Sequence, residues 1–173
     1  MSVSKITIKQ GDITKEDVDC IVNAANTSLR GGGGVDGAIH RAAGKSVLEE
    51  CIKIGGCKTG EAVITNAGNL KVKKIIHTVG PVWSGGKHRE SELLRSCYRK
   101  SFELAKKSKI KTIAFPAIST GAYGYPIEEA ADIALEEGIR FENDFEEIRF
   151  ICFSRGDFEI YENIFAEISP KDV

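Results

Sequence analysis

The chain has 173 residues, of which 42% are hydrophobic and 28% charged, and its 24 basic and 25 acidic side chains leave a formal net charge of −1. This composition is typical of a globular protein with a sizeable core. It excludes a transmembrane helix, because no apolar run is long enough, and it gives no support for direct nucleic-acid binding. The length favours one domain over residues 1–173.

Strand-like and helix-like segments alternate along the chain. Strand patterns cover 5–10, 20–24, 62–65, 74–79, 112–116 and 148–153. Helices are predicted from Val35 or Asp36 onward, over 91–107, from Pro126 to Gly138, and from an N-cap at Asp157 to 167. This alternation favours an α/β fold with a largely parallel sheet covered by helices. Segments 20–24 and 112–116 are continuously apolar, which is typical of central strands buried on both faces.

Cysteine usage predicts free, buried thiols. The five cysteines are odd in number and scattered, at Cys20, Cys51, Cys57, Cys97 and Cys152, without the repeated close spacing of a zinc site. We therefore expect a reducing, cytoplasmic location, and the first residues do not form a signal peptide.

We also expect no metal and no cofactor. Asp12, Asp17 and Asp19 are close in sequence, but no histidine or cysteine pattern joins them.

Two glycine-containing loops, 26–37 and 119–126, each follow a buried strand. In open α/β sheets, ligands bind beyond the carboxyl ends of the strands, so the loops should be neighbours in space. The amides of Gly31–Gly34 and of the following helix start can approach an anion closely. Two such loops predict a diphosphate held from two sides, although four glycines alone would equally suit a flexible surface loop.

Two phosphate-binding motifs are matched only superficially. Gly32, Gly34 and Gly37 fit G-x-G-x-x-G, but about seven residues separate them from the strand that they should follow directly. The Gly44-Lys45-Ser46 run lacks the glycine that a P-loop needs five positions earlier. Neither motif is accepted.

Five motifs in the right order show a family resemblance. GDIT at 11–14, IVNAAN at 21–26, GGGGVDGAIHRAAG at 31–44, HTVGPVW at 77–83 and FPAISTGAYGYP at 115–126 together resemble a macrodomain of the MacroD type, which includes bacterial O-acetyl-ADP-ribose deacetylases. The resemblance extends from about residue 6 to 165. It implies a three-layer α/β/α fold around a mixed, mostly parallel sheet, with an ADP-ribose cleft across the strand ends.

The resemblance also implies roles for particular residues. Asp12 and the Ile13 amide would bind adenine, and Phe153 would pack on the same ring. Asn26 would hold hydroxyls of the distal ribose and assist catalysis, with Asp36 as the catalytic acid or base. The diphosphate would lie between two sets of residues, Ser119, Thr120, Gly121, Ala122 and Tyr123 on one side and Gly33, Gly34 and Val35 on the other.

Asp36 also has a purely structural interpretation, as a carboxylate stabilised by the positive end of a helix. An ionised carboxylate beside a bound ester can instead activate water. His40 lies one helical turn further on and could orient Asp36, although a lone helical histidine is more often structural. We interpret His77 as packing or loop support and His88 as solvated.

Tyrosines flank the second glycine-containing loop. Tyr123 could cover the distal ribose as a lid, and Tyr125, before Pro126, is expected to be structural.

The resemblance therefore favours a metal-independent hydrolase that binds ADP-ribose and cleaves acyl esters of its distal ribose. Its substrate would be O-acetyl-ADP-ribose or a protein carrying mono-ADP-ribose on Asp or Glu, and we expect a monomer. The alternative is a non-catalytic module that reads ADP-ribose. Weaker alternatives are a phosphatase acting on phosphorylated ADP-ribose and a partner role in RNA processing.

Overall fold

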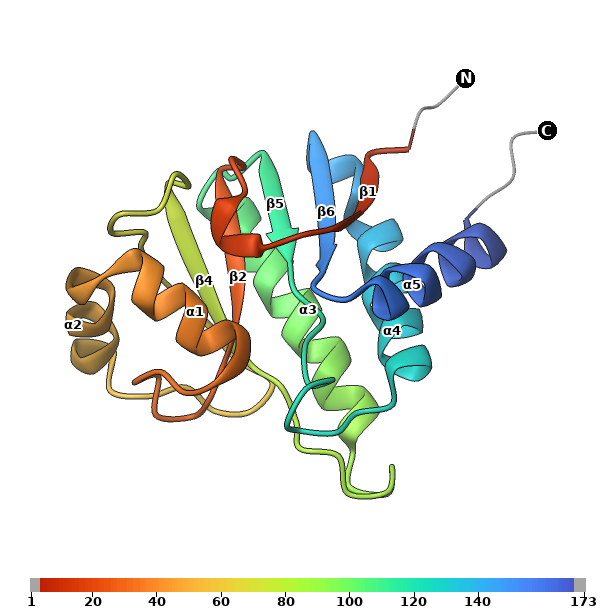
Figure 1. Cartoon of the computed structure of the whole chain (residues 1–173), viewed down its shortest axis with the longest axis horizontal. Helices are drawn as coiled ribbons and strands as arrows, with labels where there is room; N and C mark the ends of the chain where they lie inside the picture. The colour runs from red at the N-terminus through yellow and green to blue at the C-terminus, as the bar shows by residue number, and fades with distance from the viewer. Residues whose placement is uncertain (1–3, 170–173) are drawn as a thin grey trace.

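The computed structural model describes residues 4–169 and contains a six-stranded sheet (Figure 1). The strands are β1 (Ile6–Gln10), β2 (Cys20–Ala25), β3 (Ala62–Asn66), β4 (Lys74–Val79), β5 (Thr112–Phe115) and β6 (Glu147–Cys152). Their spatial order is β1-β6-β5-β2-β4-β3, and all neighbours are parallel except β3 and β4. The prediction of a mixed, mostly parallel sheet is confirmed.

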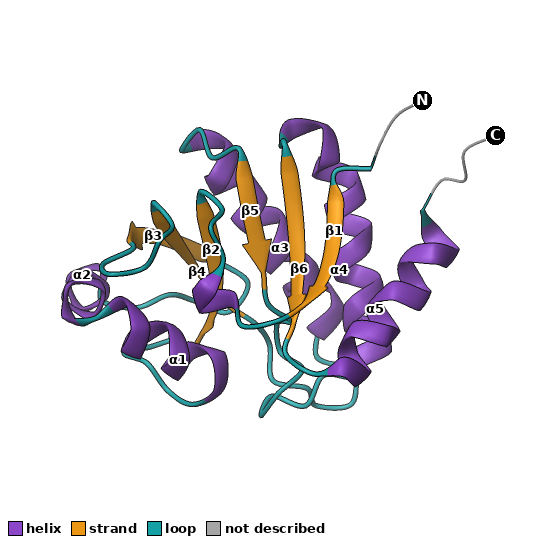
Figure 2. Cartoon of the chain, turned by 45° about the horizontal axis from the view of Figure 1, so that its top comes forward, coloured by secondary structure: helices purple, strands orange, loops and turns teal. Residues whose placement is uncertain are grey.

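Helices cover both faces of the sheet. They are α1 (Gly34–Ala43), α2 (Lys45–Ile54), α3 (Glu90–Lys107), α4 (Ile127–Phe141) and α5 (Arg155–Ile168), with short 3₁₀ turns η1 (Ile13–Lys15) and η2 (Glu142–Asp144). Figure 2 shows α1 and α2 on the opposite side of the sheet from α3 and α4. A separate hydrophobic cluster fills each side, so the predicted three-layer α/β/α architecture is confirmed.

The central strand β2 shows why the sequence folds in this way. Its first three residues, Cys20, Ile21 and Val22, are fully buried because helices pack on both faces of the sheet. Asn23 is equally buried, at 0% exposure, although it is polar. A buried amide in such a strand needs hydrogen-bond partners, and these partners lie in the candidate site.

Several predicted boundaries are wrong. Helix α4 does not end at Gly138 but continues to Phe141, because Gly138 lies where a Cβ atom would be only 2.9 Å from Phe150 Cζ. The glycine therefore allows close packing of α4 on β6. Pro126 is the N-cap of α4 and not its first residue. At α5 the N-cap is Ser154, whose hydroxyl accepts a hydrogen bond from the Asp157 amide at 3.1 Å.

Further differences concern α2 and the end of β6. Helix α2 has no counterpart among the predicted helices, and β6 ends one residue before Phe153. All five cysteines are free and buried, as predicted. No helix within residues 4–169 has both the length and the apolar character needed to cross a membrane.

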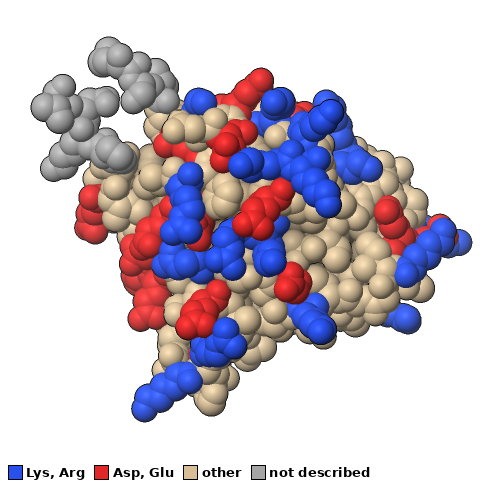
Figure 3. Space-filling view, turned by 180° about the vertical axis from the view of Figure 1, so that it is seen from behind, with Lys and Arg blue, Asp and Glu red and all other residues tan. Residues whose placement is uncertain are grey.

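Charges of both signs are mixed on the face formed by α3 and α4. Figure 3 shows basic and acidic side chains interleaved on this side of the molecule. Some form pairs between elements, such as Arg95 with Glu136 at 3.1 Å and Lys106 with Asp144 at 3.3 Å. This pairing prevents the basic residues from forming one continuous positive surface on this face.

Candidate active site

The predicted site residues lie along one edge of the sheet, at the carboxyl ends of four strands. Asp12 follows β1, Phe153 follows β6, the loop 117–125 follows β5, and the loop 26–33 follows β2 (Figure 1). Because these strands are adjacent and parallel in the order β1-β6-β5-β2, their loops form a row. The prediction that the two glycine-containing loops are neighbours is therefore confirmed.

The first loop leaves the start of α1 open. Gly33 is the N-cap and makes no side-chain capping bond, and Gly34 has a φ of +56°, which favours glycine. Both residues are exposed, and a Cβ atom on either would meet nothing within 4 Å. The start of α1 is thus without a side-chain cap, and the space beside Gly33 and Gly34 is open to an anionic group.

Asp36 lies in the first turn of α1 and is only 5% exposed. Its Oδ1 accepts a hydrogen bond from Asn23 Nδ2 at 2.9 Å and lies 3.4 Å from His40 Nε2. Its Oδ2 faces the glycine loop, since a Cβ atom built on Gly32 would lie 3.2 Å from that oxygen. One carboxylate oxygen is thus held from within the protein, and the other faces the loop.

Behind Asp36, a chain of buried side chains crosses three strands. Asn23 in β2 lies directly opposite His77 in β4, and its Nδ2 is 3.1 Å from His77 Nδ1. The other ring nitrogen of His77 lies 2.9 Å from Thr65 Oγ1 in β3. Burial, followed by the charge of His40, lowers the pKa of His77 to about 4, so its ring is neutral near pH 7.

Sequence reasoning missed Asn23 and interpreted His77 as packing or loop support. A usable signal was present for Asn23, because an amide inside a continuously apolar strand must find a buried partner. The identity of that partner depends on which strands are neighbours, which the sequence does not reveal.

Asn26 organises the first loop. Its Nδ2 donates to the Gly31 carbonyl at 2.9 Å, and its Oδ1 accepts from the Ser28 hydroxyl at 2.7 Å and from the Leu29 amide at 3.1 Å. Both acceptor positions of its oxygen are therefore used, and one N–H remains free. A Cβ atom on Gly32 would lie 3.3 Å from Asn26 Nδ2, so this amide and Asp36 flank the same glycine. Asn26 can offer a ribose a donor but no acceptor in this conformation.

The second loop is tightly built around Ser119. This residue is buried and has a φ of +68°, which is unusual for a side chain larger than glycine. It packs against Gly80, where a Cβ atom would overlap Ser119 Oγ. The Tyr125 amide donates to the Ser119 carbonyl at 2.9 Å, and the Trp83 amide donates to the Tyr123 carbonyl at 2.8 Å. The loop is thereby fixed, with its tip at 121–122 exposed.

The two loop tyrosines differ in their surroundings. Tyr125 is 3% exposed and packs on the ring of Trp83, with ring centroids 4.8 Å apart, which supports its expected structural role. Tyr123 is only half-buried, so its predicted role as a lid over the distal ribose stays a prediction.

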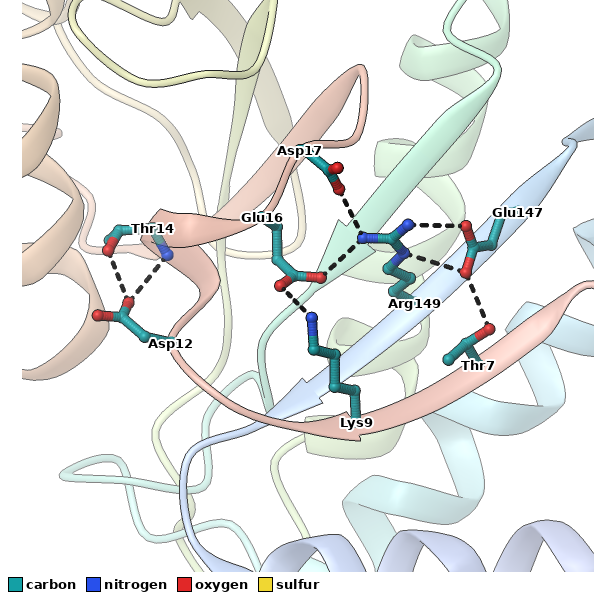
Figure 4. Close-up of polar contacts among 8 residues, drawn as sticks. All are labelled: Thr7, Lys9, Asp12, Thr14, Glu16, Asp17, Glu147 and Arg149. Carbon is teal, nitrogen blue, oxygen red and sulfur yellow. Dashed lines mark hydrogen bonds and ion pairs between the residues drawn. The ribbon is translucent and has the colours of Figure 1, made fainter.

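The opposite end of the row is open and built from local contacts. Asp12 is the exposed N-cap of η1, and its Oδ1 accepts from the Thr14 amide at 2.9 Å and from the Thr14 hydroxyl at 2.6 Å (Figure 4). The Thr14 hydroxyl is the main reason why the pKa of Asp12 is lowered. Phe153 is 87% exposed and lies beside this turn, because Cys152 pairs with Gln10. A flat aromatic ring and a carboxylate are thus available to a planar base.

An ion-pair network fixes η1 on the sheet (Figure 4). The Arg149 guanidinium in β6 lies 3.0 Å from carboxylate oxygens of Glu16, Asp17 and Glu147. Glu16 is 4% exposed and also pairs with Lys9 at 2.8 Å. These contacts hold the segment that carries Asp12 on the sheet.

One group of potential metal ligands does occur within residues 4–169. Ligand atoms of His40, Cys51 and His77 lie within 4.8 Å of one another, and Cys51 Sγ is 3.9 Å from His77 Nε2. The histidine neighbour that Cys51 lacks in the sequence is therefore supplied by the fold. Whether this group can bind a metal depends on which of its ligand atoms carry protons.

Comparison with known proteins agrees with the fold and the motifs. The Macro domain family model matches residues 22–134, and the chain therefore belongs to the macrodomain family. A Macro domain-containing protein of Methanosarcina mazei is 59% identical over 90% of this chain and 84% of its own length. An O-acetyl-ADP-ribose deacetylase of Salmonella newport is 50% identical over 95% of this chain and 96% of its own length.

A solved structure gives the same result. A variant of the Oceanobacillus iheyensis macrodomain with ADPR superposes with a TM-score of 0.89 at 47% sequence identity, covering 95% of this chain and 93% of that one.

Proposed function

We propose that this chain is a hydrolase that binds ADP-ribose and cleaves acyl esters of its distal ribose. The substrates would be O-acetyl-ADP-ribose and mono-ADP-ribose attached through an ester to Asp or Glu of a protein. In both, water adds its oxygen to an ester and the products are a carboxylic acid and the ribose hydroxyl. The similarity to an O-acetyl-ADP-ribose deacetylase over nearly the whole chain supports the first substrate.

The row of loops suits an extended ligand. Asp12 would accept a hydrogen bond from the adenine amino group with its second oxygen, since Oδ1 already holds Thr14. Amides of the second loop and of the start of α1 would bind the diphosphate, because neutral backbone donors can carry an anion where few cationic side chains are available. The distal ribose would then reach Asn26 and Asp36, which flank Gly32.

The observation that carries the proposal is the placement of the two Asp36 oxygens. Asn23 holds Oδ1, and Oδ2 faces the glycine loop. In this role Asp36 would use Oδ2 to orient a water molecule and to accept its proton as the ester is attacked. General-base catalysis of this kind contributes about 10²- to 10⁴-fold to a rate, and it requires no metal ion.

The test compares wild type with Asp36→Asn, an isosteric change that removes the base. Hydrolysis of O-acetyl-ADP-ribose and of an ADP-ribosylated glutamate peptide would be followed by chromatography, and ADP-ribose affinity would be measured by calorimetry. We expect kcat to fall by about 10²- to 10⁴-fold on both esters while affinity changes little. If wild type binds ADP-ribose but hydrolyses neither ester, the chain is a reader module and Asp36 is only a helix-terminal carboxylate.

A further inference from the structure

We propose that His77 is a positioning residue that fixes the catalytic carboxylate through Asn23. Thr65 holds the His77 ring in one tautomer, and the ring then accepts a hydrogen bond from the amide that binds Asp36. The functional part of this inference rests on the proposed role of Asp36 in ester hydrolysis.

The direction of each hydrogen bond follows from its neighbour. Thr65 Oγ1 lies 2.9 Å from the Asn66 carbonyl, which can only accept, so the hydroxyl proton points there. Oγ1 must then accept from His77 Nε2, also at 2.9 Å, which places the ring proton on Nε2. His77 Nδ1 is left with a lone pair and accepts an N–H of Asn23 at 3.1 Å.

The last hydrogen bond of this series joins Asn23 to Asp36, the proposed catalytic group. The second N–H of the same Asn23 nitrogen donates to Asp36 Oδ1 at 2.9 Å. The reverse orientation of this amide would place its oxygen against the carboxylate and is unfavourable. Asn23 Oδ1 is buried and has no hydrogen-bond partner within residues 4–169. The Asn23 nitrogen thus serves two acceptors, His77 Nδ1 and Asp36 Oδ1.

The neutral ring is essential to this arrangement. A second proton on His77 would lie on Nδ1 and face the Asn23 N–H, which would push the amide away from the carboxylate. The ring contacts Asn23, Thr65 and Cys51 and lies beside His40, with ring centroids 6.1 Å apart. The acidic group that acts on it is Glu50, which raises its pKa but is outweighed by burial. Burial keeps His77 neutral, so the series of hydrogen bonds from Thr65 through His77 and Asn23 to Asp36 stays intact at neutral pH.

The same proton assignment argues against a metal site at His40, Cys51 and His77. The His77 nitrogen nearest the sulfur is Nε2, which carries the proton and has no lone pair for a metal. Burial raises the pKa of Cys51 to about 11, so its thiol stays protonated. We therefore interpret Cys51 as the wall that closes the ring pocket.

Two matched pairs of variants test the proposal. His77→Asn can place its side-chain oxygen near the position of Nδ1 and still accept from Asn23, whereas His77→Leu is similar in size and has no acceptor. Thr65→Ser retains the hydroxyl that fixes the tautomer, whereas Thr65→Val removes it at equal volume. Thermal unfolding of every variant shows which are folded at the assay temperature, and the Thr65 pair keeps the test valid if the His77 variants are unstable.

We expect His77→Leu to lower kcat for O-acetyl-ADP-ribose by about 10- to 100-fold, the range found when a residue that orients a metal ligand is lost. His77→Asn should restore most of that rate, and Thr65→Val should lower kcat more than Thr65→Ser. KM and ADP-ribose affinity should stay within about twofold of wild type, because the substrate contacts are unchanged. Equal losses within each pair, in proportion to lost stability, would overturn the proposal.

A second readout does not depend on activity. Nitrogen NMR of histidine-labelled protein at pH 7 reports which ring nitrogen carries the proton. We expect the His77 proton on Nε2 in wild type, and a proton on Nδ1 would overturn the proposal. If wild type hydrolyses no ester, the proposed function fails, and the NMR result still decides whether His77 holds Asn23 in the orientation described.

Discussion

The two ends of the row of loops are built by opposite means. At the β1 end, Asp12 is exposed and held by Thr14, two residues away, and Phe153 projects into solvent. At the β2 end, Asp36 is nearly buried and held by Asn23, whose other partner, His77, is 54 residues away in the chain. A base needs shape and one polar contact, whereas a catalytic carboxylate needs a fixed direction. Under the proposed function, recognition would therefore rely on local structure and catalysis on the core.

The largest expected effect on stability is at Asn23. Asn23→Leu leaves Asp36 and the Nδ1 atom of His77 without their shared donor in the interior, where each unsatisfied group costs about 1–3 kcal/mol. We expect the free energy of unfolding to fall by about 2–4 kcal/mol and ester turnover to fall at least tenfold, measured by urea unfolding and by kcat. Asn163→Leu, on the exposed side of α5, is the control and should change stability by less than about 0.5 kcal/mol. A stability change at Asn23→Leu as small as that of the control would show that Asp36 is not held from the core.

The second effect is a dependence of stability on pH. The pKa of His77 is about 4 in the folded chain, against about 6.5 when unfolded, so the unfolded state takes up the proton first as pH falls. Stability is therefore lost between pH 6.5 and 4, by roughly 2–3 kcal/mol at pH 4.5. Urea unfolding at pH 7 and 4.5 should show this loss in wild type and much less of it in His77→Asn. The same loss in both proteins would mean that the histidine is not buried as a neutral ring.

A smaller effect is expected where Arg149 holds the η1 segment. Arg149→Met leaves the buried Glu16 with Lys9 alone, which should cost about 1–2 kcal/mol of stability. ADP-ribose affinity should fall a few-fold because Asp12 is less firmly placed, and kcat should be retained. Arg155→Met is the matched control, since Arg155 is exposed and its pair with Glu159 contributes little. Identical affinities for the two variants would show that the network does not support adenine binding.

The smallest effect on stability is expected at Phe153. Because its ring is exposed, Phe153→Ala should change the unfolding free energy by less than about 0.5 kcal/mol. If the ring packs on adenine, ADP-ribose binding weakens by about 1–3 kcal/mol, which calorimetry detects directly. Unchanged affinity would show that Phe153 takes no part in recognition.

The same contrast explains what could be predicted from the sequence. The strands, the two glycine-containing loops and the start of α1 are encoded by local patterns and were predicted within a few residues; α1 begins at Gly34, against a prediction of Val35 or Asp36. Helix α2 has ten residues but buries only Val47 and Cys51. Two buried positions are too few to give the repeating apolar pattern from which a helix is predicted. Helix α4 continues through Gly138 because of its packing on Phe150, which is a tertiary contact.

The polar chain behind Asp36 could not be predicted, because it depends on strand order. Asn23 and His77 meet only since β2 and β4 are neighbours in parallel register. Thr65 joins them because β3 runs antiparallel to β4. The residues themselves were visible, but their contacts exist only in the assembled sheet.

In the proposed function, the β2 end of the row performs the chemistry and the β1 end performs recognition. The decisive measurement is of kcat on O-acetyl-ADP-ribose and of ADP-ribose affinity for wild type, Asp36→Asn and Asp12→Asn. We expect Asp36→Asn to lose kcat by about 10²-fold or more and to keep its affinity. Asp12→Asn, which keeps the contact to Thr14 but replaces the free oxygen with a donor, should lose affinity and keep kcat. Loss of both properties in both variants, or turnover that survives in Asp36→Asn, would contradict it.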